Sequence, residues 1–337
     1  MKKLINDPNR VREELFEGFL AAYGKQYNLI RVGEGTVAVR RDIPDGRVAV
    51  LTGGGSGHEP LFLGALGPGM ADAAVCGDIF SAPSPDLIVA GAGAVHRGAG
   101  VCMIHGNYAG DNMNFRIACE MLAEEGIPTF QLRVWDDIAS APPARKEERR
   151  GMTADVFLIK IAGALAERGA SLAGMVPVIE RAREYCRTLG VALTSATVPQ
   201  TGKPTFEIGE SEMEIGIGMH GEPGVGREPM ASADSTCRRM IDRMVADLPF
   251  RAGDEVLLLV NSMGATTYME LYIMARAAHR VLAEYGISVH ATHAGPFFTC
   301  QEMAGCMITL MKLDEELKSL YHAPAHSPDY FLMRALE

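Results

Sequence analysis

The stretch Val48-Ala-Val-Leu-Thr-Gly-Gly-Gly-Ser-Gly-His-Glu-Pro60 decides how the chain folds. Its first four residues are apolar and predict a buried strand. Glycines then occupy positions 53–55, and glycine adopts backbone angles closed to other residues and lets a ligand approach the main chain. In open α/β sheets, ligands bind at the carboxyl ends of strands. The stretch therefore predicts a strand that ends in a ligand-binding loop, although a tight structural turn explains the same pattern.

Two familiar phosphate-binding motifs do not fit this loop. A Gly-x-Gly-x-x-Gly motif that starts at Gly53 requires glycine where the chain has His58, and no Gly-Lys-Ser/Thr of a P-loop follows. A kinase lysine strand with its glycine-rich loop is also missing, as is an acidic triplet for a metal. If the protein takes part in phosphoryl transfer, we therefore expect the nucleotide on another chain.

Length and composition indicate an α/β protein. The 337 residues are enough for about two domains, each with its own core. The 37 glycines and the low aromatic content of 7% suit an α/β fold with many tight turns. We place the domain boundary near 185–192, which assigns residues 1–188 to an N-terminal domain and residues 189–337 to a C-terminal domain.

Charge and hydropathy argue against several kinds of partner. A net charge of −10 disfavours a nucleic acid bound through a broad basic surface. The sequence has no apolar run of about 20 residues, which a membrane span needs, and no N-terminal signal pattern. The seven scattered cysteines contain no Cys-x-x-Cys pair, which favours reduced thiols and a cytoplasmic protein.

Local patterns predict several further elements. Asp7 and Pro8 are expected to open a helix, and another helix is expected over about 172–188. The charged run 141–151 predicts an exposed loop. The polar stretch 261–267 lies between a strand and a helix; a simple capped turn explains it better than an anion site does.

Two histidines lie in similar loops. His58 stands in Gly-His-Glu-Pro and His220 in Met-His-Gly-Glu-Pro, each after a predicted strand. An imidazole in such a loop can act as a base, a nucleophile or a metal ligand, but a hydrogen-bonded structural histidine explains each one alone equally well. No His-x-x-x-His or His-Glu-x-x-His spacing is present, so no metal site is predicted.

Asp111 opens a predicted helix after a second polar, glycine-containing loop, 105–110, which follows an apolar strand. On local pattern, a helix N-cap is the better explanation. The functional alternative is a carboxylate that orients and deprotonates a substrate hydroxyl, which requires one carboxylate oxygen to remain free.

Motifs along nearly the whole chain, in the same order, resemble the substrate-binding (K-type) subunit of the dihydroxyacetone kinases. The motifs are Met1-Lys-Lys-Leu-Ile-Asn-Asp7, Leu51-Thr-Gly-Gly-Gly-Ser-Gly-His-Glu-Pro60, Asp78-Ile-Phe-Ser-Ala-Pro-Ser-Pro-Asp86, Asn107-Tyr-Ala-Gly-Asp111, Glu212-Met-Glu-Ile-Gly-Ile-Gly-Met-His-Gly-Glu-Pro-Gly224, Leu259-Val-Asn-Ser-Met-Gly-Ala-Thr266 and Ile308-Thr-Leu-Met-Lys312. The resemblance implies two α/β domains, each a mixed sheet flanked by helices, and a homodimer.

The resemblance also assigns roles to residues. His220 is expected to attach covalently to a ketose carbonyl as a hemiaminal, His58 to assist this addition as an acid/base group, and Asp111 to accept the proton of the reacting hydroxyl. Main-chain amides expected to hold substrate oxygens are those of Gly55, Ser56 and Gly57. The resemblance implies no cofactor on this chain. ATP or ADP and Mg²⁺ are expected on a separate L-type subunit. In relatives that use phosphoenolpyruvate as the ultimate donor, a subunit linked to the phosphotransferase system re-phosphorylates the ADP on this L-type subunit.

Two departures from the family pattern bear on the substrate. The family commonly has lysine where this chain has Gly106, and the stretch 299–305 lacks the serine and aspartate that relatives often carry. Since Gly106 has no side chain, we expect more room and hypothesise a four-carbon ketose such as erythrulose instead of dihydroxyacetone. A second alternative is a non-catalytic, dihydroxyacetone-sensing coactivator; such relatives keep the covalent histidine and lose the acid/base residues, which this chain retains.

Overall fold

The computed structural model describes residues 2–248, 250–328 and 331–332, and it contains two six-stranded sheets. The first sheet has the order β1-β2-β4-β3-β5-β6, in which β4, β3, β5 and β6 run parallel and β1 and β2 form an antiparallel hairpin at one edge. Its strands are β1 (Tyr27–Val32), β2 (Gly35–Arg40), β3 (Ala49–Ser56), β4 (Ala73–Ile79), β5 (Val101–Gly106) and β6 (Thr129–Val134).

The second sheet has the order β11-β10-β12-β7-β8-β9. Only β10 and β11 are parallel, and the other neighbours are antiparallel. Its strands are β7 (Cys186–Ala192), β8 (Glu212–Ile215), β9 (Gly226–Pro229), β10 (Glu255–Ser262), β11 (Ser288–Gly295) and β12 (Gly305–Lys312). The prediction of mixed sheets flanked by helices is therefore confirmed.

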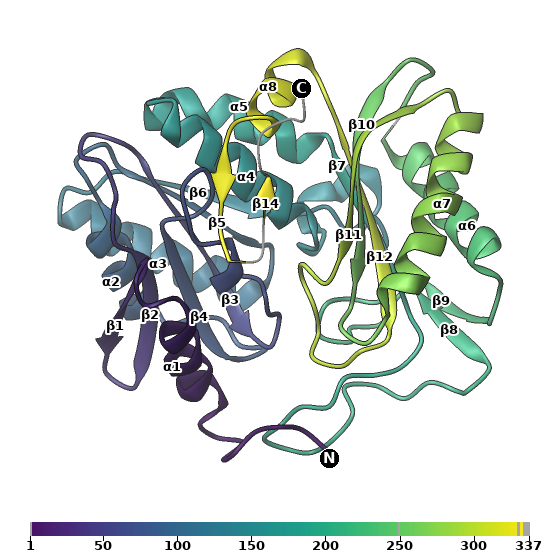
Figure 1. Ribbon diagram of the computed structural model, residues 1–337, viewed down its shortest axis with the longest axis horizontal. Helices are drawn as coiled ribbons and strands as arrows, with labels where there is room; N and C mark the ends of the chain where they lie inside the picture. Colours follow the sequence, from purple (N-terminus) through teal and green to yellow (C-terminus); the bar gives the residue numbers. More distant parts are fainter. Residues whose placement is uncertain (1, 249, 329–330, 333–337) are drawn as a thin grey trace.

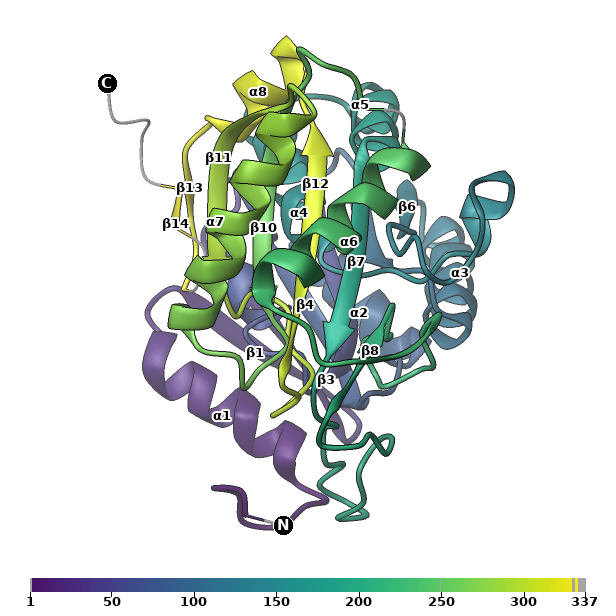
Figure 2. The ribbon, with the colours of Figure 1, turned by 90° about the vertical axis from the view of Figure 1, so that its right-hand side faces the viewer.

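Helices cover the outer faces of both sheets and fill the space between them (Figure 1). α2 and α3 lie outside the first sheet, and α6 and α7 lie outside the second, as the turned view shows (Figure 2). The helices are α1 (Val11–Tyr23), α2 (Pro85–Val95), α3 (Ala109–Glu124), α4 (Ala154–Glu167), α5 (Leu172–Glu184), α6 (Ala233–Asp247), α7 (Tyr268–Glu284) and α8 (Glu315–Tyr321), with short 3₁₀ turns η1 (Leu63–Ala65) and η2 (Pro143–Glu148). A small hairpin, β13 (Ala325–His326) and β14 (Phe331–Leu332), completes the described chain. None of the described helices is long and apolar enough to cross a membrane.

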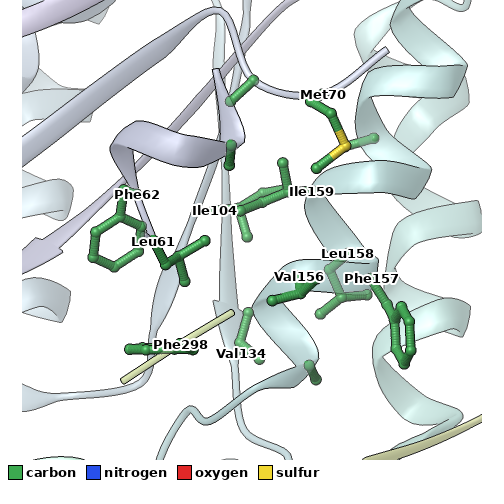
Figure 3. Close-up of a cluster of buried hydrophobic side chains, with 14 of the residues drawn as sticks. Leu61, Phe62, Met70, Ile104, Val134, Val156, Phe157, Leu158, Ile159 and Phe298 are labelled. Atoms are coloured by element: carbon green, nitrogen blue, oxygen red, sulfur yellow. The ribbon is translucent and has the colours of Figure 1, made fainter. Parts of the chain in front are cut away.

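Helix α4 lies between the two sheets and contacts strands of both. Its residues are apolar on nearly all sides, which is typical of a buried helix. In Figure 3, Val156 and Ile159 of α4 lie in one apolar cluster with Ile104 of β5, and Phe298 from the second half lies at the edge of that cluster. The same buried cluster continues into the second sheet. Both halves of the chain therefore share part of one core, which holds their loops in fixed relation.

Two predicted helix bounds are wrong. Helix α1 begins at Val11, because Asp7 and Pro8 lie in a turn before it. The helix expected over 172–188 ends at Glu184, and β7 follows at once, since the apolar residues after Cys186 pair with β12. The expected domain boundary at 188/189 falls within this strand.

The charged run 141–151 is not an exposed loop throughout. Arg149 is completely buried and forms a bidentate ion pair with Asp247 of α6. Arg187 contacts the same carboxylate from β7. The Asp247 carboxylate therefore balances the charge of the buried Arg149, which the local sequence pattern had placed in solvent.

Candidate active site

The site lies where loops at the ends of β3 and β5 meet the loop after β8. There a small cavity is lined by side chains from both halves of the chain. Its lining consists of Gly53, Gly54, Gly55, His58, Phe62, Gly106, Tyr108, Asp111, Asp155, Met219, His220 and Phe298. His58, Asp111 and His220, which the sequence singled out separately, therefore lie together.

The two histidines are in direct contact. The Nε2 atoms of His58 and His220 lie 3.1 Å apart, although 162 positions separate the residues. Nδ1 of His58 donates to the carbonyl of Thr299 at 2.7 Å, because a carbonyl oxygen can only accept. One proton must therefore lie between the two Nε2 atoms for them to form a hydrogen bond. Burial and the neighbouring His220 lower the pKa of His58 to about 3, so His58 stays neutral.

Glu222 holds His220 in place from the opposite side. Its Oε1 accepts from Nδ1 of His220 at 2.8 Å, and its Oε2 accepts from the His220 main-chain amide at 2.9 Å. Although burial raises the pKa of Glu222, the hydrogen bond and charge of His220 lower it to about 2. The ionised carboxylate fixes Nδ1 as the protonated nitrogen, and Nε2 faces the cavity.

Thr299 and Gln301, which follow β11, form hydrogen bonds to His58 and its neighbours in the chain. The main-chain amide of Thr299 donates to the His58 carbonyl at 3.2 Å, and the Thr299 hydroxyl donates to the Glu59 carbonyl at 2.7 Å. The amide of Gln301 donates to the Gly57 carbonyl at 3.0 Å. Thr299 and Gln301 therefore position the loop after β3 through main-chain bonds and the Thr299 hydroxyl.

Asp111 is the third residue of α3 and does not cap it. The N-cap position belongs to Tyr108, so the N-cap explanation is wrong. Asp111 is only 9% exposed, and its Oδ1 has no hydrogen-bond partner among the described residues. Burial raises its pKa to about 6, although the nearby His220 opposes this shift. The free oxygen is what a base for a substrate hydroxyl requires.

Gly53, Gly54 and Gly55 belong to β3, so the prediction that the strand ends before the glycines is wrong. All three line the cavity, whereas Ser56 and Gly57 do not belong to the lining. The Ser56 hydroxyl donates to the Gly77 carbonyl at 2.7 Å, and the Gly57 amide donates to the Glu59 carboxylate. Of Gly55, Ser56 and Gly57, only Gly55 therefore belongs to the cavity lining.

The glycines also have a packing role. A Cβ at Gly54 would lie 2.6 Å from the Phe62 ring, and one at Gly55 would lie 2.7 Å from the amide of Ser81. Neither position has room for a side chain. The glycines thus permit close packing of β3 as well as access to its main chain.

Gly106 lies at the cavity as predicted, but it does not create the expected room. A Cβ there would lie 3.1 Å from two ring atoms of Tyr108, so the tyrosine ring already covers this position. The same ring packs edge-on against His220, with centroids 4.9 Å apart. His105 turns away from the cavity, contacts Gln131 and stacks on Phe115.

Arg150 braces the loop that carries His220. Its Nε donates to Asp137 at 2.8 Å and its Nη2 to the Gly216 carbonyl at 2.8 Å; Nη1 lies 3.4 Å from the carbonyls of Glu222 and Pro223. Sequence reasoning missed Arg150 together with Tyr108 and Asp155. It also missed the role of Glu222, for which the Glu-Pro shared by both histidine loops was the available signal.

Two other features of the described chain bear on its chemistry. Within residues 2–248, 250–328 and 331–332, no three His, Cys, Asp or Glu side chains gather into a group that could hold a metal ion. The polar turn 261–267 ends in a capping box between Thr267 and Glu270, which confirms the simple capped connection.

Comparison with known proteins gives a consistent result. The Dak1 domain model matches residues 17–329. The chain is 42% identical over 330 residues to a D-erythrulose kinase of Mycolicibacterium smegmatis, covering 98% of this chain and 56% of that protein. It is also 42% identical over 317 residues to the dihydroxyacetone-binding subunit DhaK of a PTS-dependent dihydroxyacetone kinase of Listeria innocua, covering 94% and 95%.

Two solved structures have the same fold over almost the whole chain. The dihydroxyacetone kinase of C. freundii matches with a TM-score of 0.90 at 29% identity, covering 98% of this chain and 60% of that one. A dihydroxyacetone kinase operon co-activator matches with a TM-score of 0.88 at 30% identity, covering 94% and 98%. The resemblance inferred from the motifs is thereby confirmed, and the chain belongs to the Dak1 domain family.

Proposed function

We propose that the chain is the ketose-binding subunit of a dihydroxyacetone-type kinase, a phosphotransferase, and that His220 holds the substrate as a hemiaminal. The observation that carries the proposal is the alignment of His220 between Glu222 and His58, with Nε2 at the cavity. The names of the relatives, a dihydroxyacetone-binding subunit and a D-erythrulose kinase, support a small ketose as the substrate.

The proposed addition follows from the proton arrangement. The proton that the two Nε2 atoms share moves onto Nε2 of His58, which frees the lone pair on Nε2 of His220. Nε2 of His220 then attacks the carbonyl carbon, a C–N bond forms, and the π electrons move to the carbonyl oxygen, which takes the proton from His58. Nδ1 of His220 keeps its proton, and the positive charge on the substituted imidazole faces the Glu222 carboxylate at 2.8 Å. Glycerol has no carbonyl and cannot be held in this way.

Asp111 then acts on the tethered substrate. Its Oδ1, which has no partner among the described residues, accepts the proton of the terminal hydroxyl. That hydroxyl oxygen attacks the terminal phosphoryl group of ATP on the partner, and ADP leaves. Because the ketose is covalently held, its hydroxyl stays in line for attack, so positioning supplies much of the rate. Gly55 and Gly106 offer main-chain groups beside the ketose, while Ser56 and Gly57 act indirectly by shaping the loop.

The phosphoryl donor belongs to a partner in this proposal. ATP or ADP and Mg²⁺ are placed on an L-type subunit, with ATP or, through the phosphotransferase system, phosphoenolpyruvate as the ultimate source. The DhaK relatives are named as dihydroxyacetone-binding subunits of kinases, which supports a partner chain here. We further propose a homodimer in the cytoplasm that serves glycerol metabolism; the seven free cysteines suit a reducing compartment.

A coactivator is the second candidate function, because the chain also matches a co-activator structure over 94% of its length. The presence of both His58 and Asp111 in the cavity favours the enzyme, since a sensor needs no base for a hydroxyl.

The test follows the carbonyl carbon directly. Dihydroxyacetone and erythrulose labelled with ¹³C at the carbonyl are added to the protein, and NMR detects conversion of the trigonal carbon into a protein-bound tetrahedral carbon. We expect this signal in the wild type and not in His220→Ala. His279→Ala, at an exposed histidine of α7, is the control and keeps the signal. A protein-bound tetrahedral carbon in His220→Ala refutes the assignment. Phosphorylated product with an L-type partner separates the kinase from the coactivator.

A further inference from the structure

Asp155 is a second buried carboxyl group at the cavity, and the proposed mechanism gives it no role. It lies in the first turn of α4 and is completely buried. It lines the same cavity as Asp111 and His220. Neither of its carboxyl oxygens has a hydrogen-bond partner among the described residues. Burying a carboxyl group without a partner is costly, so a stable fold rarely keeps one without a use.

A neighbouring carboxyl group shows what a structural role looks like. Asp136, equally buried, accepts from the amides of Met152 and Ala154 and from the hydroxyl of Thr188, and so joins the start of α4 to β7. Asp155 follows Ala154 in α4, and its carboxyl group makes no such hydrogen bond with the described residues. Within the described chain, its carboxyl group therefore makes no hydrogen bond that joins two elements, and the residue lines the cavity.

We propose that Asp155 is a substrate-specificity residue that hydrogen-bonds the additional hydroxyl of a four-carbon ketose bound at His220. This inference rests on the proposed function and refines its substrate. The hemiaminal of dihydroxyacetone presents three oxygens, which His58, Asp111 and the glycine main chain can serve. A four-carbon ketose presents a fourth oxygen. Tyr108 already donates its hydroxyl to the Gly151 carbonyl, whereas Asp155 lines the cavity with both carboxyl oxygens free of a partner among the described residues.

The protonation of Asp155 suits a hydroxyl partner. Burial, and then the nearby Asp136 and Asp111, raise the pKa of Asp155 well above its usual range. The neutral carboxyl group has one O–H donor and a carbonyl acceptor, and both match a hydroxyl group. Asp155 also replaces Gly106 as the reason to expect a larger ketose, because Tyr108 fills the space beside Gly106.

The experiment compares the affinities of dihydroxyacetone, D-erythrulose and L-erythrulose, measured by the bound tetrahedral carbon signal, so no phosphoryl donor is needed. Asp155→Asn keeps a donor and an acceptor, whereas Asp155→Leu removes both. We expect Asp155→Leu to weaken the preferred erythrulose about 10-fold or more and dihydroxyacetone less than about 3-fold, since a site built for a hydroxyl discriminates strongly when the pairing is lost. Asp155→Asn should retain most of the preference.

Glu167→Gln, at the opposite end of α4, is the matched control and should leave all three affinities unchanged. Thermal unfolding verifies that both Asp155 variants fold, and the Asn variant keeps the test valid if the Leu variant does not. Equal losses for all three ketoses, or no loss for any, overturn the role of Asp155 while the proposed function stands. If the wild type forms no adduct with any ketose, the proposed function and this inference both fail.

Discussion

The Glu222 carboxylate accepts hydrogen bonds from two N–H groups of His220, the main-chain amide and Nδ1 of the ring. The His220 amide lies 2.9 Å from Oε2, and Nδ1 of the ring lies 2.8 Å from Oε1. One carboxylate therefore fixes both the loop and the orientation of the imidazole. It also lies where positive charge develops when Nε2 adds to a carbonyl, so it acts on adduct stability as well as on geometry.

Replacement of Glu222 tests this double role. Glu222→Gln keeps the size and an oxygen acceptor but removes the negative charge. A hydrogen bond to a charged group is worth about 1.5–3 kcal/mol, so we expect ketose affinity to fall about 10- to 100-fold. Titration of the bound tetrahedral carbon measures this affinity. Glu228→Gln on β9 is the control, and an unchanged affinity in Glu222→Gln would show that the carboxylate only shapes the loop.

Asp111 should govern phosphoryl transfer without governing adduct formation. Asp111→Asn cannot accept the hydroxyl proton, so we expect turnover with an L-type partner to fall about 100-fold or more while the adduct persists. Asp86→Asn, at a comparable first-turn position of α2, should change neither. A variant that turns over at the wild-type rate would leave Asp111 without a catalytic role.

The raised pKa of Asp111 also leads us to expect that turnover depends on pH. Only the ionised form of Asp111 accepts a proton, and burial raises its pKa to about 6. Turnover in the wild type should therefore fall as pH decreases through about 6, while the amount of adduct at saturating ketose falls less. Single-turnover rates from pH 5 to 8 measure this, with adduct followed in parallel. A rate that stays constant down to pH 5 contradicts the assignment of Asp111 as the base.

Arg150 should contribute both to the stability of the fold and to the positioning of the loop that carries His220. Arg150→Met removes the partner of the buried Asp137, and breaking a buried pair costs about 3–5 kcal/mol. It also releases the carbonyl of Gly216, so ketose affinity should fall together with the free energy of unfolding. Urea unfolding and the adduct titration measure both. Arg145→Met, at an exposed pair with Glu148, should alter neither, and intact affinity in Arg150→Met would mean that the loop needs no brace.

Because of Asp155, the free energy of unfolding should decrease as the pH rises. In the folded protein Asp155 keeps its proton where the unfolded chain, with an aspartate pKa near about 4, has lost it. The folded state then binds more protons than the unfolded state, so the free energy of unfolding decreases with pH above about 4. Asp155→Asn lacks this contribution, and the variant should gain stability relative to the wild type between pH 5 and 8. Parallel pH profiles of the two proteins in urea unfolding would contradict the buried, protonated state.

The sequence by itself was enough to determine the α/β class, the strand that ends in glycines, the two histidine loops and the family. These features depend on neighbours in the chain: an apolar run makes a strand, glycines open its end, and the Thr267 cap is satisfied three residues later by Glu270. Motifs of this kind are local, so they are visible without coordinates.

The tertiary structure decided how these parts meet. Contact between His58 and His220 across 162 positions depends on the packing of two sheets around α4, which no local pattern records. Packing also placed the Tyr108 ring over Gly106 and buried Arg149 against Asp247. It left Asp155 at the cavity with no hydrogen-bond partner in the described part of the chain. Each of these outcomes depends on which distant groups exclude water around a side chain, and burial changes the cost of a charge and the pKa of a carboxyl group far more than its sequence neighbours do.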